Sequence, residues 1–112
     1  LVDEFYEDIF EIDRWSSKTG QALSLIAMAN LNIKKENMTM AELNLSLVEI
    51  EKVELSYSNY VALFYYQAKL KITHQNKVEI ENKKIRTKLE NLIEETGFTK
   101  FNQSVIDYTY IS

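Results

Sequence analysis

The side chains that most often perform catalysis or bind metals are scarce in this 112-residue sequence. It contains no cysteine, and its single histidine is His74. Lys71 lies three positions before this histidine, so the Glu-x-x-His spacing of helical di-iron sites is absent. Glu7 and Glu11 could share a metal ion, but a polar helix face explains them better. With only two glycines, the sequence also lacks a glycine-rich phosphate loop. We therefore expect neither an enzyme nor a bound cofactor.

Five other side chains offer chemistry suited to holding a peptide. An asparagine amide can both donate to and accept from an extended backbone. A lysine ammonium can meet a terminal carboxylate, and a tyrosine provides apolar area with a polar tip. The candidate peptide-binding residues are Asn30, Lys34, Tyr65, Lys69 and Thr73. In the alternative interpretation Asn30 lies on a helix surface, Lys69 and Thr73 are simply solvated, and Tyr65 is a core or dimer contact.

Helices are the elements that must position these side chains. The sequence has no proline and only two glycines, so little interrupts a helix apart from its caps. Apolar residues at helical spacing predict helices over 2–14, 21–35, 40–55, from 56 or 58 to 75, and 78–96, with a short last helix after Thr99. The predicted fold class is therefore all-α, with about six helices.

Two of the predicted helix ends have specific local signals. Thr39 and Glu42 have the spacing of a capping box, which places the N-cap of the third helix at Thr39. Met38 and Leu43 would then form the accompanying hydrophobic staple. Gly97 is expected to end the fifth helix in a left-handed conformation.

The helices are expected to form antiparallel hairpins, because the predicted links are only a few residues long. Ala29 and Ala68 each follow a large apolar residue by four positions, and Ala41 opens the next helix. These offsets resemble a tetratricopeptide (TPR) unit, which predicts a TPR-like right-handed superhelix. The first helix of each pair would line its concave surface, where the five candidate residues are placed. Ile80 and Lys84 depart from the pattern, and an ordinary helical bundle would show some of these spacings by chance.

Composition and charge limit the class of protein. The 46% hydrophobic content predicts a folded chain. No apolar run reaches the roughly 18 residues that span a bilayer, and no signal peptide is visible, so no membrane contact is expected. The absence of cysteine is consistent with the cytoplasm. A net charge of −4 argues against a general nucleic-acid binder.

The charges are also unevenly distributed along the chain. Residues 1–13 carry only acidic charges, whereas residues 69–88 are mainly basic. The two stretches are either opposite docking patches or solvated helix faces with ion pairs such as Glu79–Lys83. The chain begins at Leu1 without an initiator methionine, so we expect residues 1–112 to be a single helical-repeat domain cut from a longer protein.

Three stretches resemble one known family. They are LNIKKENMTMAELNLSLVEIEK, YVALFYYQAKLKI and IRTKLENLIEETGF, with a looser likeness at FEIDRW. Together they resemble the C-terminal part of the Rgg/GadR/MutR transcriptional regulators, which are cytoplasmic proteins of low-GC Gram-positive bacteria. The sequence departs from the family pattern at Ala27, where asparagine is expected, and in the segment after Trp15.

The resemblance implies a function in quorum sensing. Such regulators have an N-terminal helix-turn-helix domain, a repeat domain that binds a short peptide pheromone, and a homodimer formed partly by the C-terminal helices. No helix-turn-helix is found in this sequence, so DNA would be bound only through a missing N-terminal domain. The chain would be the sensory and dimerising domain. The alternatives are a TPR-like protein–protein interaction adaptor with no link to DNA, and a small structural helical domain without a ligand.

Overall fold

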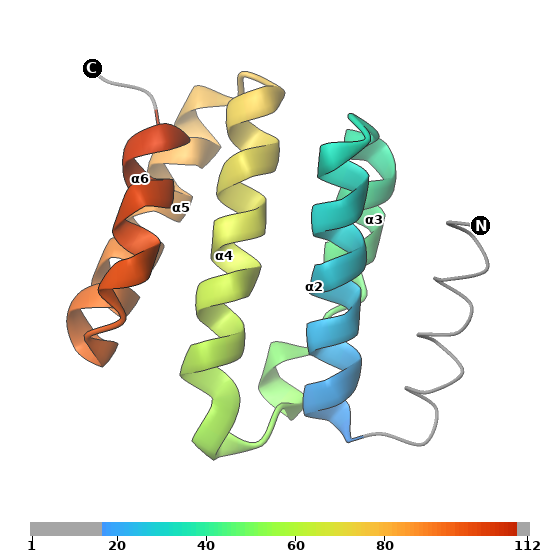
Figure 1. Cartoon of the computed structure of the whole chain (residues 1–112), viewed down its shortest axis with the longest axis vertical. Helices are drawn as coiled ribbons and strands as arrows, with labels where there is room; N and C mark the ends of the chain where they lie inside the picture. The colour runs from blue at the N-terminus through green and yellow to red at the C-terminus, as the bar shows by residue number, and fades with distance from the viewer. Residues whose placement is uncertain (1–16, 110–112) are drawn as a thin grey trace.

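The computed structural model describes residues 17–109, and this range is all-helical, with no strand (Figure 1). The predicted all-α class is therefore confirmed for this part of the chain. The α-helices are α2 (Lys18–Lys34), α3 (Met38–Ser46), α4 (Ser58–Gln75), α5 (Glu79–Thr96) and α6 (Asn102–Asp107). Three 3-10 helices accompany them: η1 (Ile50–Lys52), η2 (Leu55–Tyr57) and η3 (Thr99–Phe101). The predicted helix 2–14, with its acidic stretch and Trp15, lies outside the described residues.

Helix α2 begins earlier than its sequence pattern predicts. The side chain of Ser17 accepts a hydrogen bond from the backbone N–H of Gly20 at 3.2 Å, which caps the helix. The predicted start at residue 21 was wrong because the polar SSKTG segment was interpreted as a break, whereas it forms the cap and the first turn.

Helix α3 differs from the prediction at both ends. Its N-cap is Asn37, whose Oδ1 accepts from the backbone N–H of Met40 at 3.2 Å. Thr39 therefore lies inside the first turn, and the capping box predicted for Thr39 and Glu42 was wrong. The helix ends at Ser46 rather than at residue 55, and the Ser46 hydroxyl donates to the carbonyl of residue 43 at 2.6 Å.

Tertiary contacts explain why the chain leaves the helix after Ser46. The segment continues as η1 and η2, which place Val53 in the core with 7% of its surface exposed. The backbone N–H of Glu54 donates to Oγ1 of Thr19 on α2 at 3.2 Å. Burial of Val53 and this anchor outweigh the helical propensity of the segment, which amounts to only a few tenths of a kcal/mol per residue.

The two possible caps of α3 can be separated by mutation. We expect Asn37→Ala to lower the free energy of unfolding by about 1 kcal/mol, because an N–H of the first turn loses its side-chain partner. Thr39→Ala, the matched control, is expected to change it by less than about 0.5 kcal/mol, since alanine suits a helix interior. Urea unfolding followed by circular dichroism measures both. If Thr39→Ala lowers the free energy of unfolding more than Asn37→Ala does, Thr39 caps the helix as the sequence predicts.

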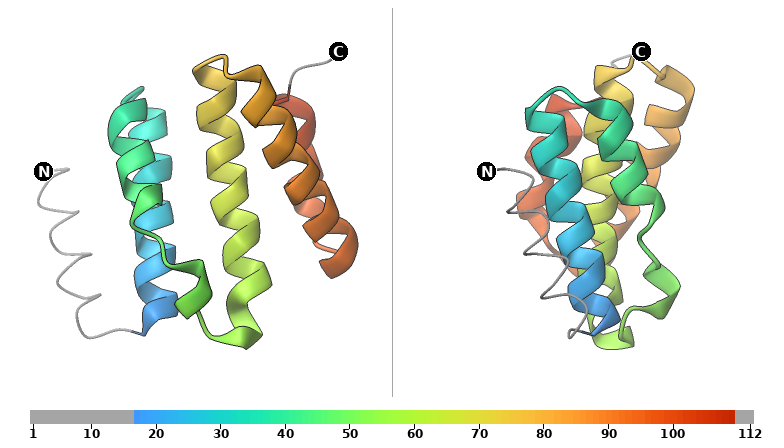
Figure 2. Two further views of the ribbon diagram at one scale, coloured as in Figure 1. Left: turned by 180° about the vertical axis from the view of Figure 1, so that it is seen from behind. Right: turned by 90° about the vertical axis from the view of Figure 1, so that its right-hand side faces the viewer.

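Helix α4 is the central element of the fold. It packs against α2, α3, α5 and α6, and Figure 2 shows α3 and α5 on one side of it with α2 and α6 toward the other. Its position, Ser58–Gln75, confirms the predicted fourth helix. Apolar side chains of α4 enter two buried clusters. The first contains Ala22, Ile26, Ala29, Ala41, Leu45, Val53, Val61, Ala68 and Ile72. The second contains Leu63, Leu70, Ile85, Leu89, Ile93 and Phe101.

The α2–α3 and α4–α5 links have the same backbone geometry. In each link one residue is left-handed, Glu36 with φ 62° in the first and Lys77 with φ 60° in the second. The next residue then donates its N–H to the carbonyl five positions back, at 2.8 Å and 2.9 Å respectively. These bonds define a Schellman motif at the end of each first helix. The two links are related by a shift of 41 residues, whereas the predicted equivalence of Ala29 with Ala68 implies 39. The predicted alignment of the two hairpins is therefore displaced by two residues from the alignment of their turns.

The C-terminal part of the described chain closes over the second cluster. Gly97 adopts φ 76° and donates its N–H to the carbonyl of Ile93 at 2.8 Å, as its sequence position predicts. The predicted ion pair between Glu79 and Lys83 is also present, at 3.3 Å. A 3-10 turn, η3, precedes the short helix α6, and its Phe101 is 1% exposed.

Candidate functional site

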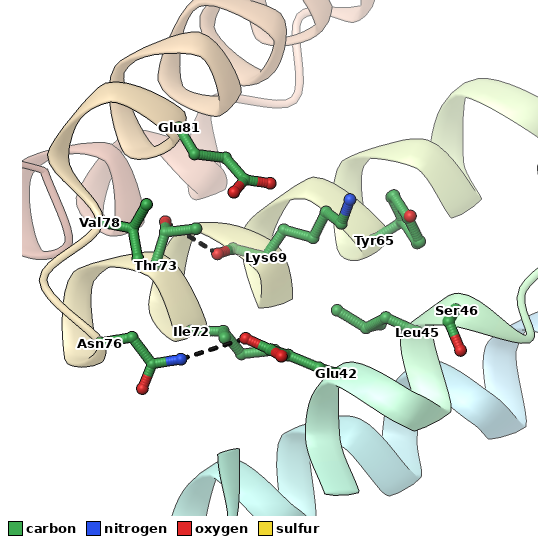
Figure 3. Close-up of a pocket in the computed structure, with 10 residues that line it drawn as sticks. All are labelled: Glu42, Leu45, Ser46, Tyr65, Lys69, Ile72, Thr73, Asn76, Val78 and Glu81. Atoms are coloured by element: carbon green, nitrogen blue, oxygen red, sulfur yellow. Dashed lines mark hydrogen bonds between the residues drawn. The ribbon is translucent and has the colours of Figure 1, made fainter. Parts of the chain in front are cut away.

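The described residues form a groove over helix α4, between α3 and α5, with a volume of about 280 Å³ (Figure 3). Its lining residues are Glu42, Leu45, Ser46, Tyr65, Lys69, Ile72, Thr73, Asn76, Val78 and Glu81. The apolar members are Leu45, Ile72 and Val78, and the remainder carry amide, hydroxyl or charged groups. The groove therefore combines apolar surface with separated polar groups, which is typical of a small ligand site.

Three of the five sequence-predicted residues lie together in this groove. Tyr65, Lys69 and Thr73 are four residues apart on α4, which places them on one face of the helix. Asn30 and Lys34 lie on α2 and do not line the groove. The structure thus brings the α4 residues together and leaves the two α2 residues apart from them.

Lys69 lies beside Tyr65 within the groove. Its Nζ is 5.2 Å from the centroid of the Tyr65 ring, within the range of a cation–π contact. No carboxylate within residues 17–109 forms an ion pair with Lys69. A ligand anion at this end would therefore meet an ammonium group whose charge no described ion pair balances.

The hydroxyl of Thr73 forms hydrogen bonds within the protein. Its hydroxyl oxygen lies 3.0 Å from the carbonyl oxygen of Lys69 and 3.1 Å from that of Leu70, to which it can donate. It also accepts from Nδ2 of Asn82 on α5 at 3.1 Å, and the residue is 7% exposed. We therefore assign Thr73 to the wall of the groove, where it joins α4 to α5.

Two carboxylates from different helices complete the groove. Glu42 extends from α3 and Glu81 from α5, and their carboxylates lie on opposite sides of the groove in Figure 3. Nδ2 of Asn76, at the end of α4, donates to Oε1 of Glu42 at 3.1 Å. None of Glu42, Asn76 and Glu81 was predicted from the sequence as a site residue, because these residues come together only through the packing of three helices. The only sequence signal was that each is polar.

The two predicted residues on α2 have different surroundings. Lys34 is exposed in the last turn of the helix. Asn30 is partly buried, and its Oδ1 is buried without a hydrogen-bond partner among the described residues. Neither residue contributes to the groove.

The titratable groups with shifted pKa values lie outside the groove lining. Burial lowers the pKa of Lys71, whose Nζ lies 5.6 Å from the centroid of the Tyr108 ring. The hydrogen bond between Glu49 and Lys52, at 2.6 Å, lowers the pKa of the glutamate and raises that of the lysine. The charged side chains of the groove itself are Lys69, Glu42 and Glu81.

Comparisons with known proteins add no further assignment. No protein-family model, no curated protein and no solved structure matches this chain. None of the helices between residues 17 and 109 has the length and apolar character needed to cross a bilayer. In the same range, no three potential His, Cys, Asp or Glu ligands gather where they could hold a metal ion.

Proposed function

We propose that this chain is the sensory and dimerisation domain of a bacterial transcriptional regulator, and that it binds a short peptide in the groove over α4. In this proposal α2–α3 and α4–α5 are successive hairpins of a TPR-like right-handed superhelix. The same backbone geometry at the two links, 41 residues apart, supports two successive helical hairpins. The resemblance to the Rgg/GadR/MutR regulators supports the homodimer and the separate DNA-binding domain.

The observation that carries the proposal is the groove itself. Its volume of about 280 Å³ is near the lower limit for small-ligand pockets, so it suits a few residues of an extended chain rather than a folded partner. Lys69 can bind the terminal carboxylate of a peptide, and the Tyr65 ring offers apolar contact beside it. The exposed side chain of Val78, with Leu45 and Ile72 at the floor of the groove, provides apolar contact for a ligand side chain between the polar groups.

The role of Lys69 can be tested with a matched lysine outside the groove. We expect Lys69→Met to weaken binding of peptides with a free carboxyl end about tenfold, the loss of one charge-assisted hydrogen bond. Lys34→Met removes the same charge from α2 and is expected to leave binding unchanged. A pool of synthetic hexapeptides, with free or amidated carboxyl ends, provides the probe for calorimetry.

The two carboxyl forms make the result specific. Amidated peptides should bind the Lys69→Met variant and the parent chain about equally, because they carry no terminal charge. If Lys34→Met and Asn30→Ala weaken binding as much as Lys69→Met does, the ligand contacts the five-residue surface predicted from the sequence instead of the groove. If no member of either pool binds the parent chain, the proposed function is wrong.

A further inference from the structure

The groove has more negative than positive charge. Glu42 and Glu81 enter it from α3 and α5, and Lys69 is the one cationic side chain among its lining residues. Figure 3 shows the ammonium of Lys69 directed toward Tyr65, away from Asn76 and Val78 at the other end. The groove therefore has a cationic end at Tyr65 and an anionic region between α3 and α5.

The two carboxylates retain most of their hydrogen-bonding capacity. Asn76 donates to one oxygen of Glu42, and within residues 17–109 the carboxylate of Glu81 has no hydrogen bond or ion pair. A carboxylate can accept about four hydrogen bonds, so this region offers several vacant acceptors. Both residues are exposed, so water solvates them in the free protein.

The surface beneath these carboxylates is suited to the stem of a basic side chain. Val78 is the accessible apolar residue of the lining, with 42% of its surface exposed, and Leu45 and Ile72, at 2% and 3% exposed, lie at the floor of the groove. Lysine and arginine can lay their methylene groups along such a surface while the charged tip remains hydrogen-bonded. A ligand carboxylate in the same place would meet two like charges and no donor except the amide of Asn76.

We propose that the peptide ligand carries a lysine or arginine side chain whose charged tip binds between Glu42 and Glu81. This inference rests on the proposed function, because it assigns the ligand class of the same groove. It also sets a spacing. Asn76, the C-cap residue of α4, follows Lys69 by seven residues, which is a rise of about 10 Å along the helix. An extended chain covers this distance in about three residues, so the basic residue is about the third residue from the carboxyl end.

The test compares two pools of synthetic hexapeptides that differ at the third residue from the carboxyl end. One pool has lysine there and the other has glutamate, with alanine, leucine and serine mixed at the remaining positions. Calorimetry with the 112-residue chain is expected to show about tenfold tighter binding of the lysine pool, and Glu81→Gln should abolish most of this preference. Glu94→Gln is the matched control, because it neutralises an exposed glutamate of α5 about 20 Å along the helix from Glu81.

The outcomes separate this inference from the function on which it rests. If both pools bind equally, or the glutamate pool binds more tightly, while Lys69→Met still weakens binding, the inference is overturned and the peptide-binding function stands. If the lysine preference survives in both Glu81→Gln and Glu42→Gln, the cation binds elsewhere and the assignment is again overturned. If neither pool binds the parent chain, both proposals are wrong.

Discussion

Replacing Leu89 with alanine is expected to lower the free energy of unfolding by about 3 kcal/mol or more, as for other truncations of a fully buried leucine. Leu89 lies on α5 with 0% of its surface exposed and belongs to the second buried cluster. The truncation removes apolar contacts and leaves a cavity among the side chains that join α5 to α4. Alanine is a good helix former, so the loss reports on packing rather than on helix propensity. Urea unfolding followed at 222 nm gives the free energy for both chains.

The control is the same substitution at an exposed leucine. Leu55, in η2, is 91% exposed, so Leu55→Ala is expected to change the free energy of unfolding by less than about 0.5 kcal/mol. A domain of this size has a total stability of roughly 5–15 kcal/mol, so the Leu89 variant loses a large share of it. Equal effects at the two positions would contradict the assignment of Leu89 to the core.

Much of the fold was predictable because it depends on local chemistry. The absence of proline and the near absence of glycine leave helices as the only regular structure that the apolar spacing supports. Helix α4 and the left-handed Gly97 follow from such signals. The two Schellman links did not, because their left-handed residues are Glu36 and Lys77. Neither glycine nor asparagine occupies these two positions, so the predicted links contain no signal for a left-handed residue.

The errors in α3 have a different cause. Two capping residues compete at its start, and the sequence alone does not decide between Asn37 and Thr39. At its end, the apolar residues after Ser46 continue to fit a helix pattern. The chain leaves the helix because Val53 reaches the first cluster and Glu54 binds Thr19 on α2. Such contacts between segments far apart in sequence override local propensity.

Only the part of the candidate site that lies on helix α4 was predictable from the sequence. Tyr65, Lys69 and Thr73 share a face because their spacing is four residues. Glu42 and Glu81 join them only through the packing of α3 and α5 on α4. The predicted pairing of Ala29 with Ala68 did not give the positions of these two helices relative to α4. The part of the groove to which we assign a cationic ligand group is therefore the part that sequence reasoning missed.

Asn82 is a fully buried polar side chain that joins three elements. Its exposed fraction is 0%, and its Nδ2 lies within hydrogen-bond distance of three oxygens. These are the carbonyl of Leu70 at 3.3 Å, Oγ1 of Thr73 at 3.1 Å and the carbonyl of Tyr108 at 2.8 Å. The amide group therefore ties α5 to α4 and to the residue that follows α6. The two carbonyl groups fix the orientation of the amide, because an oxygen in the place of Nδ2 would face two carbonyl oxygens, which can only accept.

Asn82→Asp places an oxygen there with almost no change in shape, and we expect it to destabilise the fold by about 3 kcal/mol or more at pH 7, the usual scale for an unpaired buried charge. Burial and the two facing carbonyl oxygens raise the pKa of the new carboxyl above its unfolded value. A raised pKa means that the protonated form is favoured in the folded state. The penalty is therefore full above the folded pKa, and it falls as the pH drops toward the unfolded value of about 4.

The pH dependence makes this prediction specific. The difference in unfolding free energy between the Asn82→Asp variant and the parent chain should shrink between pH 7 and pH 4, since a protonated carboxyl can again donate a hydrogen bond to one of the three oxygens. Asn91→Asp is the matched control, because Asn91 is an exposed asparagine on the same helix. Its carboxylate remains solvated, so its effect should stay below about 0.5 kcal/mol throughout this range. A small and pH-independent loss at Asn82 would mean that water reaches the side chain and that the link from α5 to α4 and Tyr108 is not buried.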